Sequence, residues 1–465
     1  MYIPKTKRFQ VRITDFFRPP DASIAAALRP KTASSSFNFS LKDGALKDGE
    51  GAAVFAVNGY DCEISGKQLL RLYYYSRYDY LNEEKDDRLL VYADDGRIYE
   101  KKLKDDSAFA PVVGLEFAAA PEGVHYKFNG EDVYLFSHGE RLYLYDGSTV
   151  SDYAAPDVTS MCICNERLFA TTGGESTTLW FSENFDPTNW YVSLNEAGFI
   201  DFQDGLGKLL KVIEHDGYAF VFRNYGITRV YAPYEQNEFT GANAEIDKVR
   251  IYGGSVADCG NRIIYLTENG FYAFDGVYSA KIATALDGFL RGEDNRSVVA
   301  AYRNGRYYAL INVNVDGEKE KVLLSLDANS GEYYLVKGLD IVDIATVFED
   351  EGKLLFLTRG DGFVSELTDD AEFYGEPCEK IWRSAFSDFG TVGRKTLAKV
   401  FVKTKGDITV TIKSDEGSET LQFSGYNGVS AATVGLVGES FSAQIKSEET
   451  GAEISSLILE FTVIT

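Results

Sequence analysis

Histidine, methionine and tryptophan are scarce: the 465 residues include only 3 His, 2 Met and 3 Trp. His125, His138 and His215 are too few and too far apart in the sequence to indicate a His-based metal site. We expect each of them at a strand end, in a structural role. The sequence also lacks HExxH, GxSxG, a Walker loop and a strand–GxGxxG–helix unit, which excludes the hydrolases and nucleotide-binding proteins that these motifs define.

Cysteine is also uncommon, and its number is odd. The five residues form no CxxC pair and lie in or beside apolar segments, where a free thiol packs as a small hydrophobic group: Cys62, Cys162, Cys164, Cys259 and Cys378. We therefore expect no structural disulfides, as in a protein assembled in a reducing cytoplasm. No window approaches the roughly 18 apolar residues of a membrane span, and Met1–Gln10 has cations without the apolar run of a signal peptide. These absences predict neither a membrane span nor a cleaved signal.

Tyrosine and phenylalanine, in contrast, are abundant, at 30 and 31 residues. Both suit the pleated, half-buried surface of a β-sheet. Short runs alternate with period two between turn residues, as in Leu90–Gly96, Arg141–Gly147 and Phe271–Gly276. Each of these runs ends in Asp-Gly, the signal of a tight hairpin that needs positive φ. The sequence therefore predicts an all-β protein of many short antiparallel strands.

Hairpin turns recur at a nearly constant interval in the second half of the chain. Their first residues are separated by 44, 44 and 47 residues, and the turns are Asp216-Gly217, Gly260-Asn261, Asn304-Gly305 and Glu351-Gly352. This interval matches the ~40–50 residues of one four-stranded propeller blade. Counting from Leu69 to Thr368 predicts a β-propeller of six or seven blades. An array of β-sandwiches is the alternative for short strands of this kind.

Composition changes on both sides of this repeat. Residues 1–50 lack periodicity and contain Pro19-Pro20 and Ser34–Ser36, so we expect an extended N-terminal arm there. Residues 51–390 are assigned to the propeller. Residues 391–465 alternate more cleanly and carry fewer aromatics, as in Ser456–Ile464, and predict a small C-terminal β-sandwich.

The formal net charge of −24 is unevenly distributed. Residues 1–31 carry +5, residues 391–465 carry −2, and the body between them carries −27. Such an acidic body repels phosphate, which argues against specific nucleic-acid binding, although solubility alone also explains it. We expect the basic residues 1–31 to leave their own propeller and lie on a neighbouring protein, so that deleting them leaves the melting temperature of the isolated chain nearly unchanged. A solvated terminus is the alternative.

Two short segments resemble known functional motifs, but neither is good evidence for the function. Ser182–Trp190 loosely resembles the Asp box of sialidases, yet it lacks the glycine of that box and occurs once, whereas sialidases repeat it. Arg359-Gly360-Asp361 spells an integrin-binding triplet, but it is followed by Gly362 between two apolar runs, as in a hairpin turn. Carboxylates are too numerous for a sequence to pair two of them as a glycosidase requires. We predict a non-enzymatic protein with no catalytic, metal-binding or cofactor-binding residues and no cofactor.

The most specific part of the chain is Thr178–Pro233. It contains four characteristic runs in order, namely Leu179–Trp190, Gly198–Phe202, Ile213–Phe222 and Gly226–Tyr231. The pattern of a strand, Ser, an acidic residue and Pro-Thr-Asn-Trp, then a strand, Gly-Ile and Tyr, resembles the propeller segment of tailed-bacteriophage virion proteins of the hub and nozzle type. Those are the proteins that stabilise packaged DNA and the nozzle proteins of short-tailed phages. Ser36–Phe39 followed by Lys42-Asp43-Gly44 resembles the entry segment of the same group.

The resemblance implies a structural virion protein that forms a ring below the portal, retains packaged DNA and provides the channel for its ejection. The implied partners are copies of itself, the portal, adaptor or other tail proteins, and DNA that passes without sequence-specific binding. The implied location is the virion tail, after synthesis and assembly in the cytoplasm of the host bacterium. The alternatives are a carbohydrate-binding or glycoside-hydrolysing propeller and a tail-tip host-attachment protein. Two facing carboxylates beside stacked aromatics would favour the carbohydrate alternative.

Overall fold

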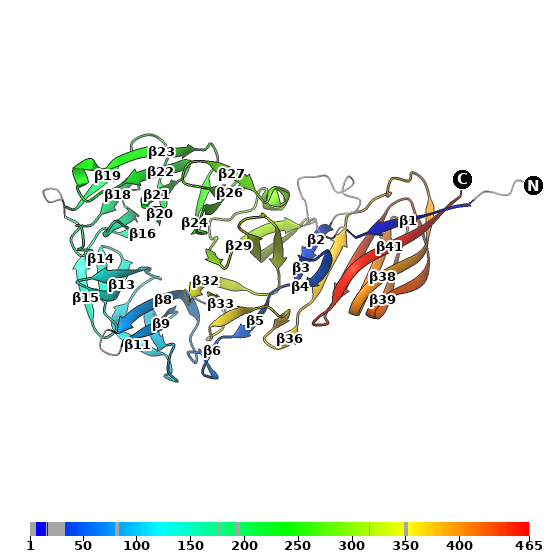
Figure 1. Cartoon of the computed structure of the whole chain (residues 1–465), viewed down its shortest axis with the longest axis horizontal. Helices are drawn as coiled ribbons and strands as arrows, with labels where there is room; N and C mark the ends of the chain where they lie inside the picture. Colours follow the sequence, from blue (N-terminus) through cyan, green and yellow to red (C-terminus); the bar gives the residue numbers. More distant parts are fainter. Residues whose placement is uncertain are drawn as a thin grey trace, which may run out of the picture.

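Strands arranged as blades around a common axis make up most of the molecule. The computed structural model describes residues 6–14, 16, 33–79, 83–174, 176–191, 196–315, 317–347 and 352–464. Six four-stranded sheets and one six-stranded sheet form a ring, and a nine-stranded sheet forms a second domain beside it (Figure 1). The helical segments in this part of the chain are short: η2 (Gln236–Glu238), η3 (Thr284–Leu286) and α1 (Asp287–Leu290). The expected all-β fold with a β-propeller is confirmed, with seven blades.

The strands of the first six blades follow one another in chain order. Blade 1 consists of β8 (Leu69–Asp79), β9 (Glu84–Ala93), β10 (Arg97–Lys102) and β11 (Ala110–Glu116). Blade 2 consists of β12 (Glu122–Phe128), β13 (Glu131–His138), β14 (Arg141–Tyr145) and β15 (Val150–Ala154). Blade 3 consists of β16 (Val158–Cys164), β17 (Arg167–Thr172), β18 (Thr178–Phe181) and β19 (Gly198–Asp201). Blade 4 consists of β20 (Leu209–His215), β21 (Tyr218–Arg223), β22 (Gly226–Tyr231) and β23 (Thr240–Ile246).

The remaining blades complete the ring. Blade 5 consists of β24 (Ile251–Asp258), β25 (Ile263–Thr267), β26 (Gly270–Phe274) and β27 (Ser279–Ile282). Blade 6 consists of β28 (Ala300–Arg303), β29 (Arg306–Val315), β30 (Glu318–Asp327) and β31 (Tyr333–Val336). Blade 7 consists of β32 (Ile341–Val347), β33 (Lys353–Thr358), β34 (Ser365–Thr368), β5 (Gly51–Val54), β35 (Glu372–Phe373) and β36 (Glu376–Pro377). A small hairpin of β6 (Ala56–Val57) and β7 (Tyr60–Asp61) follows β5.

The regular turn spacing in the sequence marks the first hairpin of successive blades. Asp216-Gly217 joins β20 to β21, and Asn304-Gly305 joins β28 to β29. Both residues of each turn have positive φ, from 47° to 82°, the backbone of a two-residue hairpin whose twist matches that of its strands. The turn at Gly260 joins β24 to β25 in the same position, whereas Glu351 lies outside the described residues. First strands of neighbouring blades contact one another around the ring, so these strands line the axis.

The ring is closed by a strand from the other end of the propeller sequence. β5 runs antiparallel to β34, with Gly51 opposite Thr368 and Val54 opposite Ser365. Blade 7 therefore combines residues from both ends of the propeller sequence. The ring cannot open at this blade without breaking the ladder between β5 and β34. Glycine at position 51 lets β5 lie close to the backbone of Asp370, because a Cβ here would lie 1.7 Å from the carbonyl oxygen of Asp370.

Tyrosine hydroxyls tie neighbouring blades together. Tyr73 and Tyr75 of β8 in blade 1 donate hydrogen bonds of 2.7 Å to backbone carbonyls of Pro121 and Asp132 in blade 2. Tyr126 of blade 2 donates in the same way to blade 3, and Tyr307 of blade 6 to blade 5. Each of these side chains buries an aromatic ring and satisfies its hydroxyl across a blade boundary. Some of the many tyrosines thus serve the contacts between blades.

The second domain packs around its own apolar core, which includes Trp382, Val400, Phe441 and Leu459. Its strands are β1 (Thr6–Ile13), β2 (Ala33–Phe37), β3 (Phe39–Lys42), β4 (Ala45–Asp48), β37 (Lys380–Ser384), β38 (Lys395–Ser414), β39 (Ser418–Gly438), β40 (Phe441–Ser447) and β41 (Glu453–Ile464). The long β38 pairs with β41 along its first half and with β40 along its second half, while β39 follows it throughout. The nine strands form one hydrogen-bonded sheet, and their buried side chains make this core.

The expected extended arm over residues 1–50 and the boundary at residue 391 are wrong. β1 pairs with β41 along eight residues, and β2, β3 and β4 also belong to the sheet of the second domain. β37 enters the same sheet before residue 391. The physical reason is that Val11 and Ile13 alternate with exposed residues and face the core, a pattern too short to stand out in the sequence. Residues 1–5, 15 and 17–32 lie outside the described residues.

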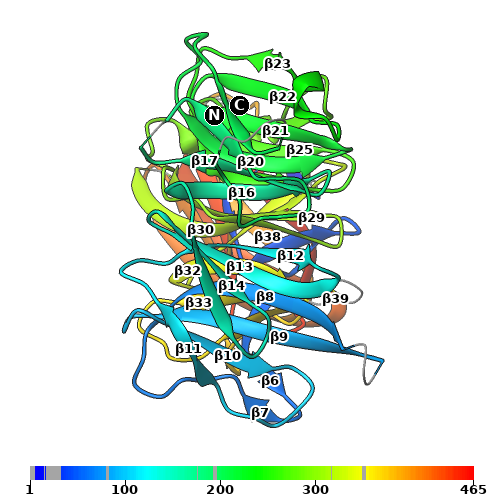
Figure 2. The same cartoon turned by 90° about the vertical axis from the view of Figure 1, so that its left-hand side faces the viewer.

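Buried polar contacts join the two domains. The side-chain amide of Asn38, between β2 and β3, donates to the carbonyls of Lys337 and Glu379 at 3.0 and 2.9 Å. The backbone N–H of Lys337 donates in return to the side-chain oxygen of Asn38 at 2.8 Å. The bonds between Asn38 and Lys337 thus tie the second domain to the end of blade 6. Within the second domain, the fully buried ammonium of Lys380 binds Asp48 and the carbonyl of Glu449, each at 2.6 Å. Figure 2 shows β12, β13 and β16 in front and the second domain behind the ring, so blades 2 and 3 face away from it.

Candidate functional site

The three histidines do not come together at one site. His138 and His215 are the last residues of β13 and β20, as expected, but His125 lies within β12 rather than at its end. His215 is buried, and its Nδ1 is 3.2 Å from a carboxylate oxygen of Asp258, across the boundary between blades 4 and 5. Among the described residues, no group of three or more His, Cys, Asp or Glu side chains is arranged to hold a metal ion.

The five thiols are free and buried, as the sequence suggests. Burial raises the pKa of Cys62 to about 11 and that of Cys259 to about 12, so both are protonated at neutral pH. Arg359-Gly360-Asp361 forms the turn between β33 and β34, and the Arg359 guanidinium binds Asp340 at 3.1 Å. The turn expected for this triplet is confirmed.

The segment Ser182–Trp190 forms a loop that closes on itself. A carboxylate oxygen of Asp186 accepts hydrogen bonds from the backbone N–H and the hydroxyl of Thr188, at 2.9 and 2.7 Å. The side-chain amide of Asn189 donates to Glu183 at 2.6 Å. The acidic side chains thus hold the loop together. At its end Trp190 packs against the core of blades 2 and 3 and is only 2% exposed.

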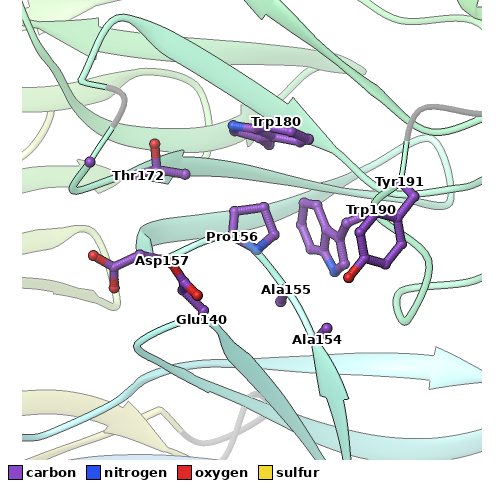
Figure 3. Close-up of a pocket in the computed structure, with 10 residues that line it drawn as sticks. Glu140, Ala154, Ala155, Pro156, Asp157, Thr172, Trp180, Trp190 and Tyr191 are labelled. Carbon is purple, nitrogen blue, oxygen red and sulfur yellow. The ribbon is translucent and has the colours of Figure 1, made fainter.

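A cavity of about 290 Å³ lies beside this loop, between blades 2 and 3 (Figure 3). Blade 2 and the segment that follows it contribute one wall, and β17, β18 and the loop contribute the other. The lining residues are Glu140, Ala154, Ala155, Pro156, Asp157, Thr172, Gly174, Trp180, Trp190 and Tyr191. It lies on the part of the propeller farthest from the second domain (Figure 1). We refer to it as the aromatic pocket.

The aromatic pocket has apolar walls. Trp180 of β18 stands opposite Phe199 of β19 in the strand register, and their ring centroids are 5.2 Å apart. In Figure 3 the indole of Trp180 is seen nearly edge-on, with one face turned toward Pro156 and Trp190 across the pocket. Tyr191 follows Trp190 at the mouth and is 69% exposed. A flat apolar group in this pocket would therefore contact apolar or aromatic side chains on more than one side.

Polar groups lie at the margins of the same space. Glu140 in the turn between β13 and β14 and Asp157 after β15 are exposed, and neither carboxylate has an ion pair among the residues that the structure describes. The indole Nε1 of Trp190 is buried, and no described atom accepts a hydrogen bond from it. A carboxylate accepts hydrogen bonds, so the margin of the pocket offers two acceptor groups.

The sequence pointed to half of this site. Trp180 and Trp190 both lie in the segment that carries the resemblance, but no pattern linked them to Glu140, Pro156 or Asp157. These residues come from the preceding blade, and only the packing of blade 2 on blade 3 brings them together. The linking Ala154–Asp157 stretch has no motif that indicates a binding role.

Comparisons with known proteins identify no family for this chain. No family model matches the chain, and no curated protein matches it. Two solved structures to which the chain is similar are BBS1N in complex with ARL6DN and the Pan2 WD40 domain of Neurospora crassa. The first has 10% sequence identity and a TM-score of 0.45, and the match covers 66% of this chain and 94% of that one. The second has 8% identity and a TM-score of 0.42, with 69% and 94% covered. No helix in the described part of the chain is long and apolar enough to cross a membrane.

Proposed function

We propose that this chain is a non-enzymatic structural protein of a tailed-bacteriophage virion, a propeller of the tail hub or nozzle type. The observation that carries the proposal is the resemblance of Thr178–Pro233 to the propeller segment of such proteins. In the structure this segment includes β18 to β22, the adjoining parts of blades 3 and 4. In this role, copies of the chain form a ring below the portal that retains packaged DNA and provides the channel for its ejection.

The attachment of the two domains supports a role in assembly. The ladder between β5 and β34 closes the propeller, and the hydrogen bonds between Asn38 and Lys337 hold the second domain against blade 6. A body with fixed geometry can repeat the same contact around a closed ring, because a symmetric oligomer needs identical interfaces in every copy.

Exposed apolar side chains on the outer parts of blades 3 to 5 offer a surface for protein partners. They are Phe199, Tyr231, Tyr234, Ile246 and Tyr278, and Tyr278 is 74% exposed. Aromatic residues are enriched at protein interfaces, where they bury a large area and still pair a polar group. In the proposed role the partners are other copies of the chain, the portal, an adaptor or other tail proteins.

The acidic body fits a channel through which DNA passes. Residues 32–390 carry −27, and carboxylates that face a lumen repel phosphate. Cations in such a lumen would bind the backbone and slow its movement. DNA would therefore pass without sequence-specific contacts. The chain would be made and assembled in the host cytoplasm and would reside in the virion tail.

Localising the chain in particles tests this proposal. A C-terminal epitope tag is added in the genome that encodes the chain, and DNA-filled particles are purified by density-gradient centrifugation. We expect the tag in the particle band, at several copies per portal, and gold-labelled antibody at the tail end of the particle. A chain that stays in the soluble fraction while tagged portal protein enters particles would refute the proposal.

A further inference from the structure

We propose that the aromatic pocket between blades 2 and 3 binds a neutral saccharide. The inference is independent of the virion role, because it rests on the chemistry of this pocket alone. Its parts come from two blades, and hydrogen bonds of Asp186 and Asn189 hold the loop Ser182–Trp190 that forms one side of it.

The apolar wall matches one face of a sugar ring. The C–H groups of a pyranose form a flat apolar patch, and the face of Trp180 turned toward Pro156 and Trp190 is the surface on which such a patch stacks. Phe199 packs beside Trp180 and limits the positions of the indole. The cavity of about 290 Å³ is at the lower end of the roughly 300–1,000 Å³ of ligand pockets, which suits one or two sugar rings.

The polar groups and the apolar wall together suit a saccharide. Glu140 and Asp157 are exposed carboxylates at the margin of the pocket, and carboxylates accept hydrogen bonds. A sugar hydroxyl donates to such a group while the C–H face of the same ring stacks on Trp180. An alkylammonium ion also pairs with carboxylates, but it lacks the flat C–H face of a pyranose. An anion is repelled by the carboxylates, and a hydrocarbon makes no hydrogen bond to them.

The small number of tryptophans allows a direct test. The chain has three, so the spectrum of the protein labelled with ¹⁵N-tryptophan has three indole N–H resonances, from Trp180, Trp190 and Trp382. Trp382 is fully buried in the second domain and serves as an internal control. The full-length chain is titrated with glucose, galactose, mannose and N-acetylglucosamine, and with cellobiose, lactose and chitobiose, up to millimolar concentrations. Trp180→Phe and Trp190→Phe assign the peaks.

The expected result is that at least one of these sugars shifts the Trp180 and Trp190 resonances and leaves that of Trp382 unchanged. Trp180→Ala should weaken the affinity up to about 10-fold, because it removes the aromatic face on which the sugar ring stacks. Glu140→Gln, at an exposed position where unfolding is not expected, should weaken it several-fold. Tyr278→Ala, which removes an exposed aromatic from blade 5, is the matched control and should bind normally.

Three results would overturn the proposal. One is that no sugar in the panel shifts either resonance. Another is binding that Trp180→Ala and Glu140→Gln leave unchanged, which would locate the saccharide elsewhere. The third is that tetramethylammonium, and none of the sugars, shifts the two resonances, which would identify the pocket as a cage for a cationic group of a partner.

Discussion

A single substitution can test whether β1 pairs with β41 of its own chain. Ile13 is the last residue of β1, is fully buried and packs in the core of the second domain, opposite Leu457 of β41. Replacing a buried Ile by Ala removes transfer free energy and leaves a cavity, at a cost of about 2–5 kcal/mol. A loss of about 3 kcal/mol lowers the melting temperature of a domain of this size by roughly 10 °C. Arg12→Ala, on the exposed side of the same strand, should change the stability by less than about 0.5 kcal/mol.

The assay is differential scanning calorimetry of the isolated full-length chain and of both variants, with urea unfolding as a second measure. Deleting residues 1–13 should have a larger effect, because it removes Val11, Ile13 and the whole ladder with β41. The loss then approaches the roughly 5–15 kcal/mol that stabilises a typical domain, and the second domain should unfold. If the deletion or Ile13→Ala leaves the melting temperature within about 1 °C of the wild-type value, β1 does not belong to its own chain's sheet. The segment would then be free to dock on a neighbour, as the sequence alone had suggested.

Three further predictions concern buried groups. Lys380→Met should destabilise the chain by about 3–5 kcal/mol in urea unfolding, because it removes the buried cation that pairs with the largely buried carboxylate of Asp48. Lys446→Met, at a half-exposed pair, should cost less than about 1 kcal/mol, and equal costs would contradict this reasoning. Burial raises the pKa of Asp343 to about 6, above its value in the unfolded chain, so its contribution to stability is present below pH 4 and is lost as the pH rises to about 6. Between pH 4 and pH 7 the wild-type chain should therefore lose up to about 3 kcal/mol of unfolding free energy, measured in urea, that the Asp343→Asn variant does not lose. Parallel curves of unfolding free energy against pH for the two proteins would refute this. Gly51→Ala should lower the melting temperature of the propeller, because the Cβ of the new alanine would lie 1.7 Å from the carbonyl oxygen of Asp370. Gly435→Ala, where a Cβ has no neighbour within 4 Å, should leave the melting temperature unchanged. Similar melting temperatures for both variants would argue against closure of the ring by β5.

The fold was largely predictable because its signals are local. The 44-residue spacing of Asp216, Gly260 and Asn304 reflects one hairpin in the same place of successive blades, and its positive φ favours Gly, Asn and Asp. Leu69 and Thr368, between which the repeat is counted, are the first residue of β8 and the last residue of β34. The sequence does not distinguish six blades from seven, because the fourth strand of blade 7 comes from Gly51–Val54, far in the sequence from its partner Ser365–Thr368.

Long-range pairing accounts for what the sequence did not reveal. The apolar side of β1 consists of Phe9, Val11 and Ile13, too few residues to separate a strand from an irregular arm. Its partner β41 lies at the opposite end of the chain, so no local pattern connects the two. The aromatic pocket was missed for the same reason, since Glu140 and Trp190 come from different blades.

The central claim is that copies of this chain form a ring around the DNA channel of a phage tail. The most direct measurement is a cryo-electron-microscopy reconstruction of DNA-filled particles from the phage that encodes the chain. The account predicts a closed symmetric ring of seven-bladed propellers below the portal, with a channel face that is net acidic and has few lysine or arginine side chains pointing inward. Particles without density for the chain, or a channel in which it presents rows of lysine and arginine to the DNA, would contradict it.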